Sequence, residues 1–231
     1  MEDGIAVMVS LIGAAIGGLG GTFVGYFLQE RRRKQQINEL VTKQYLSQFQ
    51  HFSESLWFRL HNIMFRGGSA VMKDDYFLQT TLYALASFLA YKWIMTLEGI
   101  YAQIELIDLR LDPKIKEDIH NVGGNLDDIA KSLGAQMYYY DRRSLAESVL
   151  EKKDGIWMVS KFIDFQKNYF GEGNHVEINA GKDFVMKLGK KRPEGETKRY
   201  ILKFMDEIAE IVIELTNATK IPAKDELKNK A

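Results

Sequence analysis

The chain has 231 residues, with 31 Lys and Arg balanced by 31 Asp and Glu, and it contains no cysteine. This composition excludes a strongly basic protein that binds nucleic acid along its whole length, and it excludes a small scaffold held together by disulfides. Hydrophobic residues make up 46% of the chain, which is enough to build a core and rules out global disorder.

An uncharged run, 5–28, lies near the N-terminus. As an α-helix it would be about 36 Å long, enough to cross a hydrocarbon layer of about 30 Å. The sequence therefore predicts a transmembrane helix over 5–28, preceded by a short external tail at 1–4. A cleaved signal peptide is the alternative, but it would need a basic leader, and Glu2 and Asp3 precede this run instead.

A basic juxtamembrane segment follows at 29–36. It contains four consecutive cationic side chains, namely Arg31, Arg32, Arg33 and Lys34. Positive flanks stay on the cytoplasmic side of a membrane helix. We therefore expect a single-pass protein of the cell inner (plasma) membrane, with its N-terminus outside and its C-terminal domain cytoplasmic. The four cations are expected to contact anionic lipid head groups.

Glycine recurs at every fourth position inside the uncharged run, at Gly13, Gly17, Gly21 and Gly25. A strip of small residues lets two membrane helices pack closely. The strip predicts a homo-oligomer or pairing with another membrane protein. The plainer interpretation is that glycine is frequent in membrane helices.

Residues 37–217 carry apolar positions at the spacings of three and four that are typical of core-facing helices. The first helix is expected from 37 to 65, before Gly67 and Gly68, and it could continue the membrane helix without a break. The second is expected from 74 or 75 until Pro113. Its part 76–91 is apolar on nearly all sides but too short to span a bilayer, so it is predicted to be the buried central helix.

Four further helices are expected, over about 113–133 with a break at Gly123 and Gly124, and over about 142–152, 157–170 and 197–217. The connection 171–195 is predicted to be a loop, strands find little support, and the lysine-rich tail 218–231 is predicted to be solvated and mobile. The predicted fold class is all-α, with an N-terminal transmembrane helix followed by an antiparallel helical bundle with long helices.

Catalytic and metal-binding constellations find little support. The chain has no cysteine and no nucleophile elbow, and its histidines are isolated. Glu117 and His120 have the spacing of one di-iron ligand pair, but the second such pair, Glu172 and His175, falls in the expected loop. We therefore expect no catalytic residues, no metal and no cofactor, and no nucleic-acid partner; the chain is more consistent with a non-enzyme.

The densest aromatic and charged cluster is 138–143. Tyrosines beside arginines can hold a nucleobase or an anionic group, which makes Tyr138, Tyr140, Arg142 and Arg143 the candidate pocket residues. The plainer alternative, which we favour on the sequence, is a helix start with its tyrosines packed inward and its arginines paired to acids.

The segments 81–83 and 88–91 resemble the central helix of a family of uncharacterised microbial proteins. Members of that family have one N-terminal membrane helix and a helical cytoplasmic domain. The segments 56–63 and 105–109 resemble its flanking segments, so the resemblance covers about 45–150. It implies an architecture and no activity.

Together these features predict a membrane-anchored helical scaffold or regulatory interaction protein. The alternative is a membrane-tethered ligand sensor or enzyme with a pocket near 138–143.

Overall fold

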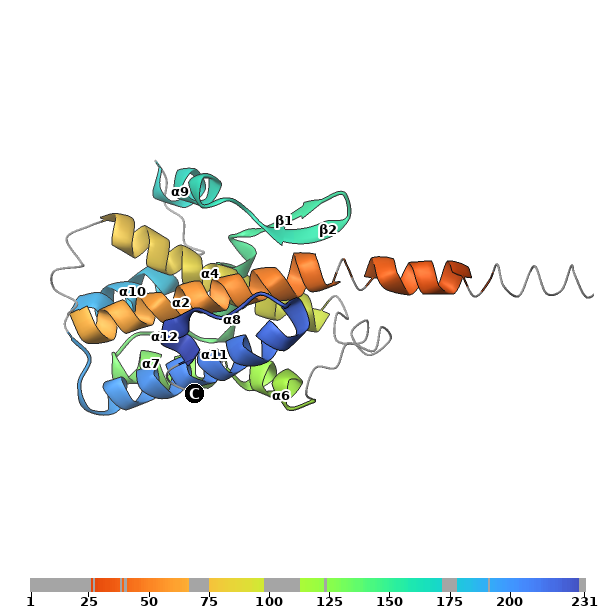
Figure 1. The fold of residues 1–231 in the computed structure, drawn as a ribbon. Helices are drawn as coiled ribbons and strands as arrows, with labels where there is room; N and C mark the ends of the chain where they lie inside the picture. The colour runs from red at the N-terminus through yellow and green to blue at the C-terminus, as the bar shows by residue number, and fades with distance from the viewer. Residues whose placement is uncertain are drawn as a thin grey trace, which may run out of the picture.

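The computed structural model describes residues 26, 28–37, 39, 41–66, 75–97, 113–122, 124–171, 178–190 and 192–228. This part of the chain is mostly helical and carries one two-stranded sheet, so the all-α class is confirmed (Figure 1). Its elements in chain order are η1 (Val41–Leu46, a π-helix), α2 (Ser47–Arg66), α4 (Asp75–Leu97), α6 (Pro113–Asn121), α7 (Gly124–Ser132), α8 (Tyr139–Glu147), β1 (Leu150–Lys153), β2 (Ile156–Val159), α9 (Phe162–Phe170), α10 (Asn179–Lys190), α11 (Gly195–Thr219) and α12 (Asp225–Lys228).

The centre of the core joins α2, α4 and α11. Phe49 of α2 stacks on Phe88 of α4 with the ring centroids 5.6 Å apart, and Phe88 meets Phe204 of α11 edge-on at 6.1 Å. All three side chains are fully buried. Burying one such side chain stabilises a fold by about 1.5–3 kcal/mol. These three rings therefore hold together helices from the beginning, middle and end of the chain.

Helices α2 and α11 run in opposite directions. Thr219, at the end of α11, donates its hydroxyl to Oε1 of Gln50 near the start of α2, at 2.6 Å. Arg192, just before α11, donates from Nε to the carbonyl of Met64 near the end of α2, at 2.9 Å. The two ends of this antiparallel pair are thus fastened by hydrogen bonds as well as by the apolar stripe between them.

Helix α4 is buried on most sides, as the sequence predicts. α2 packs against it on one side, and α8 and α10 pack against it on another. The approach of α10 is close, because a Cβ atom on Gly181 would lie 2.9 Å from Cδ1 of Leu82 in α4 and 3.0 Å from Cδ2 of Leu145 in α8. A helix enclosed in this way needs apolar residues all round, which explains its lack of a polar face.

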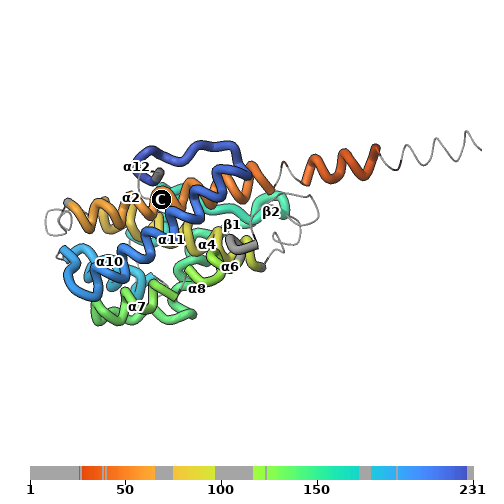
Figure 2. Tube along the Cα trace, turned by 60° about the horizontal axis from the view of Figure 1, so that its bottom comes forward, coloured from red at the N-terminus to blue at the C-terminus, as the bar shows by residue number. Residues whose placement is uncertain are grey.

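The membrane localisation expected from the sequence is contradicted. Within the ranges that the structure describes, no helix has both the length and the apolar character needed to cross a bilayer. The segment 5–28, including the glycines at every fourth position, lies outside those ranges except for Tyr26 and Leu28, whose side chains are exposed. We therefore withdraw the single-pass placement in the inner membrane. The polar helical stretch 28–37 projects from the bundle at the end where α2 begins (Figures 1 and 2).

A β-hairpin occupies part of the region where helices were expected over 142–152 and 157–170. α8 ends at Glu147, and β1 pairs antiparallel with β2. Asp154 and Gly155 connect them with φ of 52° and 82°. Two successive left-handed residues form a type I′ turn, for which Asp-Gly is a preferred pair. The expected helices are therefore wrong at Lys152 and Trp157, which lie in strands.

The connection 171–195 contains a helix, α10, where a loop was expected. Its buried residues are Gly181, Phe184, Val185, Leu188 and Gly189, which recur at helical spacing. Glycine lowers helix propensity by about 1 kcal/mol relative to alanine. At Gly181 that cost is offset by the close packing against α4 and α8, which a larger side chain would obstruct.

The segment 220–228 packs against α2, although a solvated tail was expected over 218–231. Nε2 of Gln50 donates to the carbonyl of Ile221 at 3.0 Å, and Leu227 of the short helix α12 is fully buried. α12 lies beside α2 in both orientations (Figures 1 and 2). A tail rich in lysine can still dock when a single leucine faces the core.

The remaining expected helices are confirmed in outline. η1 and α2 together cover the first helix of the bundle, and α11 covers the last. The break expected at Gly123 and Gly124 falls between α6 and α7. The part of the second helix beyond 97 lies outside the described residues.

Candidate functional site

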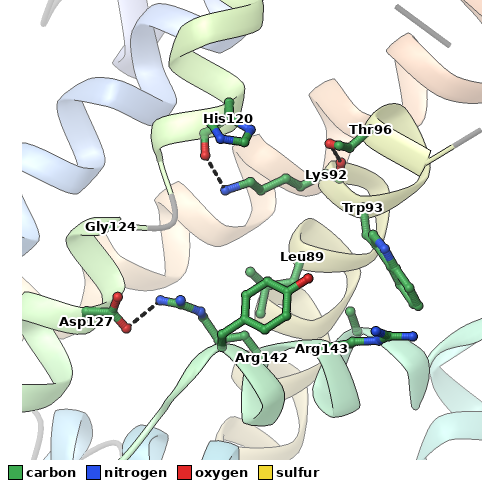
Figure 3. A pocket seen from close by; sticks show the side chains of 11 residues that line it. Leu89, Lys92, Trp93, Thr96, His120, Gly124, Asp127, Arg142 and Arg143 are labelled. Carbon is green, nitrogen blue, oxygen red and sulfur yellow. Dashed lines mark hydrogen bonds and ion pairs between the residues drawn. The ribbon is translucent and has the colours of Figure 1, made fainter. Parts of the chain in front are cut away.

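A cavity of about 350 Å³ lies between α4, α6, α7 and α8, and we term it the α4–α8 pocket (Figure 3). Three kinds of side chain line it: cationic ones (Lys92, Arg142, Arg143), largely apolar ones (Leu89, Trp93, Tyr139, Ala146), and a mixed group consisting of Thr96 on α4 with His120, Gly124 and Asp127 at the α6–α7 side. Small-molecule sites commonly measure about 300–1,000 Å³, so this cavity suits a small ligand.

Two helix faces of identical spacing form the walls. On α4 the lining residues follow i, i+3, i+4, i+7, at Leu89, Lys92, Trp93 and Thr96. On α8 the same spacing gives Tyr139, Arg142, Arg143 and Ala146. Residues at these positions share one side of a helix. Because α4 and α8 pack together, their two matching faces meet at the cavity.

The third wall comes from the junction of α6 and α7. α6 brings the backbone carbonyl of His120 to the cavity, and α7 brings Gly124 and Asp127. Nζ of Lys92 donates to the His120 carbonyl at 2.8 Å, which ties α4 to α6. Figure 3 shows this bond joining Lys92 on α4 to His120 on α6 at the edge of the cavity.

Lys92 is the most perturbed titratable group of the pocket. Burial lowers the pKa of its ammonium from an ordinary 10.5 to about 8; the positive charge of Arg142 lowers it as well, and Asp127 opposes the shift. A buried ammonium near another cation is unfavourable, so the neutral amine gains population. Lys92 therefore has a substantial neutral fraction near physiological pH.

Arg142 is held by an ion pair across two helices. Its Nη1 donates to Oδ1 of Asp127 at 2.6 Å, joining α8 to α7. The arginine side chain is 16% exposed, whereas the aspartate side chain is 39% exposed. A charge-assisted bond to a largely buried guanidinium fixes its orientation. Arg142 thus presents a positioned positive charge to the cavity.

Arg143 lies over the indole ring of Trp93, with its Cζ atom 4.9 Å from the ring centroid. Its Nε also donates to Oε1 of Glu147 at 2.9 Å. The guanidinium and the indole come from opposite walls, α8 and α4, and Figure 3 shows them side by side. Together they form a flat cationic and aromatic edge on the pocket.

The structure places the sequence-predicted pocket residues in two groups. Arg142 and Arg143 line the α4–α8 pocket, whereas Tyr138 and Tyr140 are not among its lining residues and are 63% and 76% exposed. Tyr139 lines the pocket instead. It lies three and four residues before the two arginines, in phase with their helix face.

The plainer alternative for 138–143 fits in part. Both arginines are paired to acids, at Asp127 and Glu147. The three tyrosines are exposed rather than packed inward. The arginines nevertheless face a cavity, which the plainer alternative does not include.

The other predicted site residues give no further site. Arg31, Arg32, Arg33 and Lys34 are exposed on the helical stretch 28–37. Among the residues whose positions the structure describes, no three His, Cys, Asp or Glu side chains gather as metal ligands. Sequence reasoning missed Lys92, Trp93 and Asp127; a lysine interrupting an apolar helix one position before a tryptophan was the available signal.

A second cavity, of about 480 Å³, lies beside the start of α11. Two of its cations already bond to the backbone: Lys187 donates to the Gly134 carbonyl at 2.7 Å, and Arg192 donates to Met64. Lys187 also pairs with Asp183. The lining of this second cavity contains no aromatic side chain, whereas Trp93 and Tyr139 line the α4–α8 pocket, which is therefore the stronger candidate for an organic ligand.

The chain matches no protein-family model, no curated protein and no solved structure. The resemblance to an uncharacterised family therefore gains no support, and function has to be argued from the pocket itself.

Proposed function

We propose that this protein binds a small organic anion with a flat apolar body in the α4–α8 pocket. The observation that carries the proposal is the convergence of Lys92, Arg142 and Arg143 on one cavity that also contains Trp93. The proposal keeps the ligand-binding alternative predicted from the sequence and drops its membrane tether.

Charge supports an anionic ligand. Three cationic side chains line the cavity against one carboxylate, that of Asp127. Field lines from like charges concentrate in a cleft with low-dielectric walls, which attracts a ligand of opposite sign. An ammonium has three N–H donors, and that of Lys92 directs one to the His120 carbonyl. The ligand is therefore expected to carry a carboxylate, sulfonate or phosphate group.

Shape and apolar lining support a planar body. Trp93, Leu89 and Ala146 give the cavity an apolar surface, and the Arg143 guanidinium already lies over the indole ring. Aromatic rings and guanidinium planes both accept a stacked ring. A volume of about 350 Å³ accommodates one or two fused rings with one charged substituent.

Anilinonaphthalene sulfonate tests the proposal, because it combines a flat body with an anionic group and fluoresces in apolar sites. We expect saturable binding at one site that weakens with rising salt. Trp93→Ala and Arg143→Ala should each weaken the affinity about tenfold, equivalent to about 1.4 kcal/mol.

Arg199→Ala is the matched control. Like Arg143, Arg199 lies over an aromatic ring, at 5.1 Å from the Tyr200 centroid, and pairs with a glutamate, Glu196. It is not among the residues that line either cavity. Equal affinities in the Arg143→Ala and Arg199→Ala variants would overturn the proposal.

The interaction role and the homo-oligomer expected from the sequence stay predictions. Pull-down and sizing of the purified chain would test them independently of ligand binding.

A further inference from the structure

We propose that Lys92 forms an imine with the carbonyl group of an aldehyde or ketone that the α4–α8 pocket holds through its anionic group. This inference rests on the proposed binding function and names the ligand class more narrowly, as an anionic carbonyl compound. It also assigns Lys92 a covalent role that the two arginines cannot share, because guanidinium groups stay protonated in proteins.

The geometry places the Lys92 amine at the pocket wall in a fixed position. Its Nζ is anchored by the carbonyl of His120 at 2.8 Å. Trp93 follows it on the same helix face and lines the same cavity. A ligand ring lying against the indole would therefore have its substituents within reach of the amine. Figure 3 shows Lys92 and the two arginines entering from different helices.

No carboxylate forms an ion pair with Lys92 among the residues with described positions. The carboxylate that lines the same pocket, that of Asp127 in α7, pairs with Arg142 at 2.6 Å instead. The charged or titratable groups that line the pocket around Lys92 are His120 from α6, Asp127 from α7, and Tyr139, Arg142 and Arg143 from α8. Cations outnumber carboxylates in this set, which disfavours the ammonium form.

The consequence is an amine that is neutral more often than that of an ordinary lysine. With the pKa of Lys92 lowered to about 8 by burial and by Arg142, about a quarter of the molecules carry a neutral amine at pH 7.5. An ordinary lysine is neutral in only about one molecule in a thousand at that pH. Lysines made nucleophilic by desolvation or by a neighbouring cation are the ones that form Schiff bases.

The reaction balances without any oxidant or reductant. The Lys92 nitrogen lone pair attacks the carbonyl carbon, and one N–H proton moves from that nitrogen to the carbonyl oxygen to give a carbinolamine, whose nitrogen keeps the second proton. The C–O bond then breaks, the hydroxyl leaves as water with the second proton, and a C=N bond forms. One amine and one carbonyl give one imine and one water molecule.

Lys182 provides a matched internal control. Burial also lowers the pKa of Lys182, its Nζ donates to the carbonyl of Tyr169 at 3.2 Å, and it lies 4.5 Å from the ring centroid of Phe170. It is not among the residues that line either cavity. A general effect of partial burial would make both lysines reactive, whereas the pocket mechanism singles out Lys92.

The test uses para-carboxybenzaldehyde and its alcohol counterpart, para-(hydroxymethyl)benzoate, on the full chain. After incubation with the aldehyde and reduction by borohydride, peptide mapping should find the benzylamine adduct on Lys92 at least about tenfold more than on Lys182 or on exposed lysines. Both compounds should displace anilinonaphthalene sulfonate. Lys182→Arg should leave both the displacement and the adduct on Lys92 unchanged, because Lys182 lines neither cavity.

Two results distinguish failure of the imine proposal from failure of the binding proposal. If both compounds displace the fluorophore but the adduct spreads evenly over the lysines, the imine is refuted and anion binding stands. If neither compound displaces it and the adduct is even, the binding proposal and the imine fall together.

Discussion

Replacing Lys92 by methionine should stabilise the protein at neutral pH. Methionine fills the space of the lysine stem without its charge. In the folded protein the pKa of Lys92 is lowered to about 8, whereas the unfolded chain has the ordinary 10.5. The unfolded chain therefore binds the proton more tightly, and below pH 8 folding carries the full cost of burying the ammonium.

The magnitude follows from the two pKa values, 10.5 and about 8. Their difference corresponds to about 3 kcal/mol when both states are protonated. Methionine also loses the hydrogen bond to the His120 carbonyl, which costs about 1 kcal/mol. The expected net gain at pH 7 is about 2 kcal/mol.

The sign of the pH dependence is fixed by the same values. Because the folded pKa is lowered, Lys92 of the folded protein has lost its proton above about pH 8, whereas the unfolded chain keeps it until about pH 10.5. Wild-type stability therefore rises between these two pH values. At pH 9.5 the cost of burial falls to about 1 kcal/mol, similar to the value of the lost hydrogen bond, so the advantage of Lys92→Met should nearly vanish. Tyr91, whose pKa burial raises to about 12, reduces stability only as pH rises above its unfolded value of about 10.

Urea unfolding of both proteins at pH 7 and pH 9.5 measures these differences. Comparing variant with wild type at each pH cancels the contribution of every other titrating group. A Lys92→Met variant that is less stable than wild type at pH 7 would refute the reasoning, because it would mean that the ammonium is stabilised where it lies. An advantage that is the same at both pH values would refute it equally.

Three further outcomes are expected from packing and backbone geometry, each measured by urea or thermal unfolding. Phe88→Ala should cost about 3–5 kcal/mol because it opens a cavity between three helices, whereas Tyr140→Ala on the surface should stay within about 0.5 kcal/mol. Gly155→Ala should cost about 1–2 kcal/mol because φ there is 82°; no loss would contradict the turn type. Leu227→Ala should cost about 2 kcal/mol and the exposed Glu226→Ala almost nothing, and equal effects would mean that α12 is not docked.

The sequence predicted those helices whose apolar stripes are long. α2 and α11 repeat the helical spacing over twenty residues or more, and most of the 23 residues of α4 are apolar. Two shorter elements, the β-hairpin and α10, were not predicted. The hairpin has four-residue strands, and its first strand is mostly charged, so the alternation typical of a strand is weak on both sides of the Asp154-Gly155 turn. α10 lies within the connection 171–195, whose start is rich in glycine and favours a loop, and the tight contact that accommodates Gly181 has no local signal in the sequence.

The pocket could be predicted only in part. Arg142 and Arg143 stand out as neighbours in the sequence, so composition was enough to find them. Lys92 and Asp127 come from separate helices, and nothing local signals that α4 and α7 meet there. The sequence prediction chose Tyr138 and Tyr140 as pocket residues, but only Tyr139 lies on the same face of α8 as the two arginines.

The pairing of α2 with α11 has a consequence for synthesis of the chain. The hydrogen bond between Gln50 and Thr219 spans 169 residues. Ribosomes add about 5–20 residues per second, so a nascent α2 waits roughly 10–30 s for its final partner. During that interval Phe49 can stack on Phe88 of α4, but Phe204 of α11, which packs against Phe88 in the finished fold, has not yet been synthesised. Shielding of this surface during translation, by chaperones or by transient contacts with α4, is therefore a condition for a good yield of folded protein.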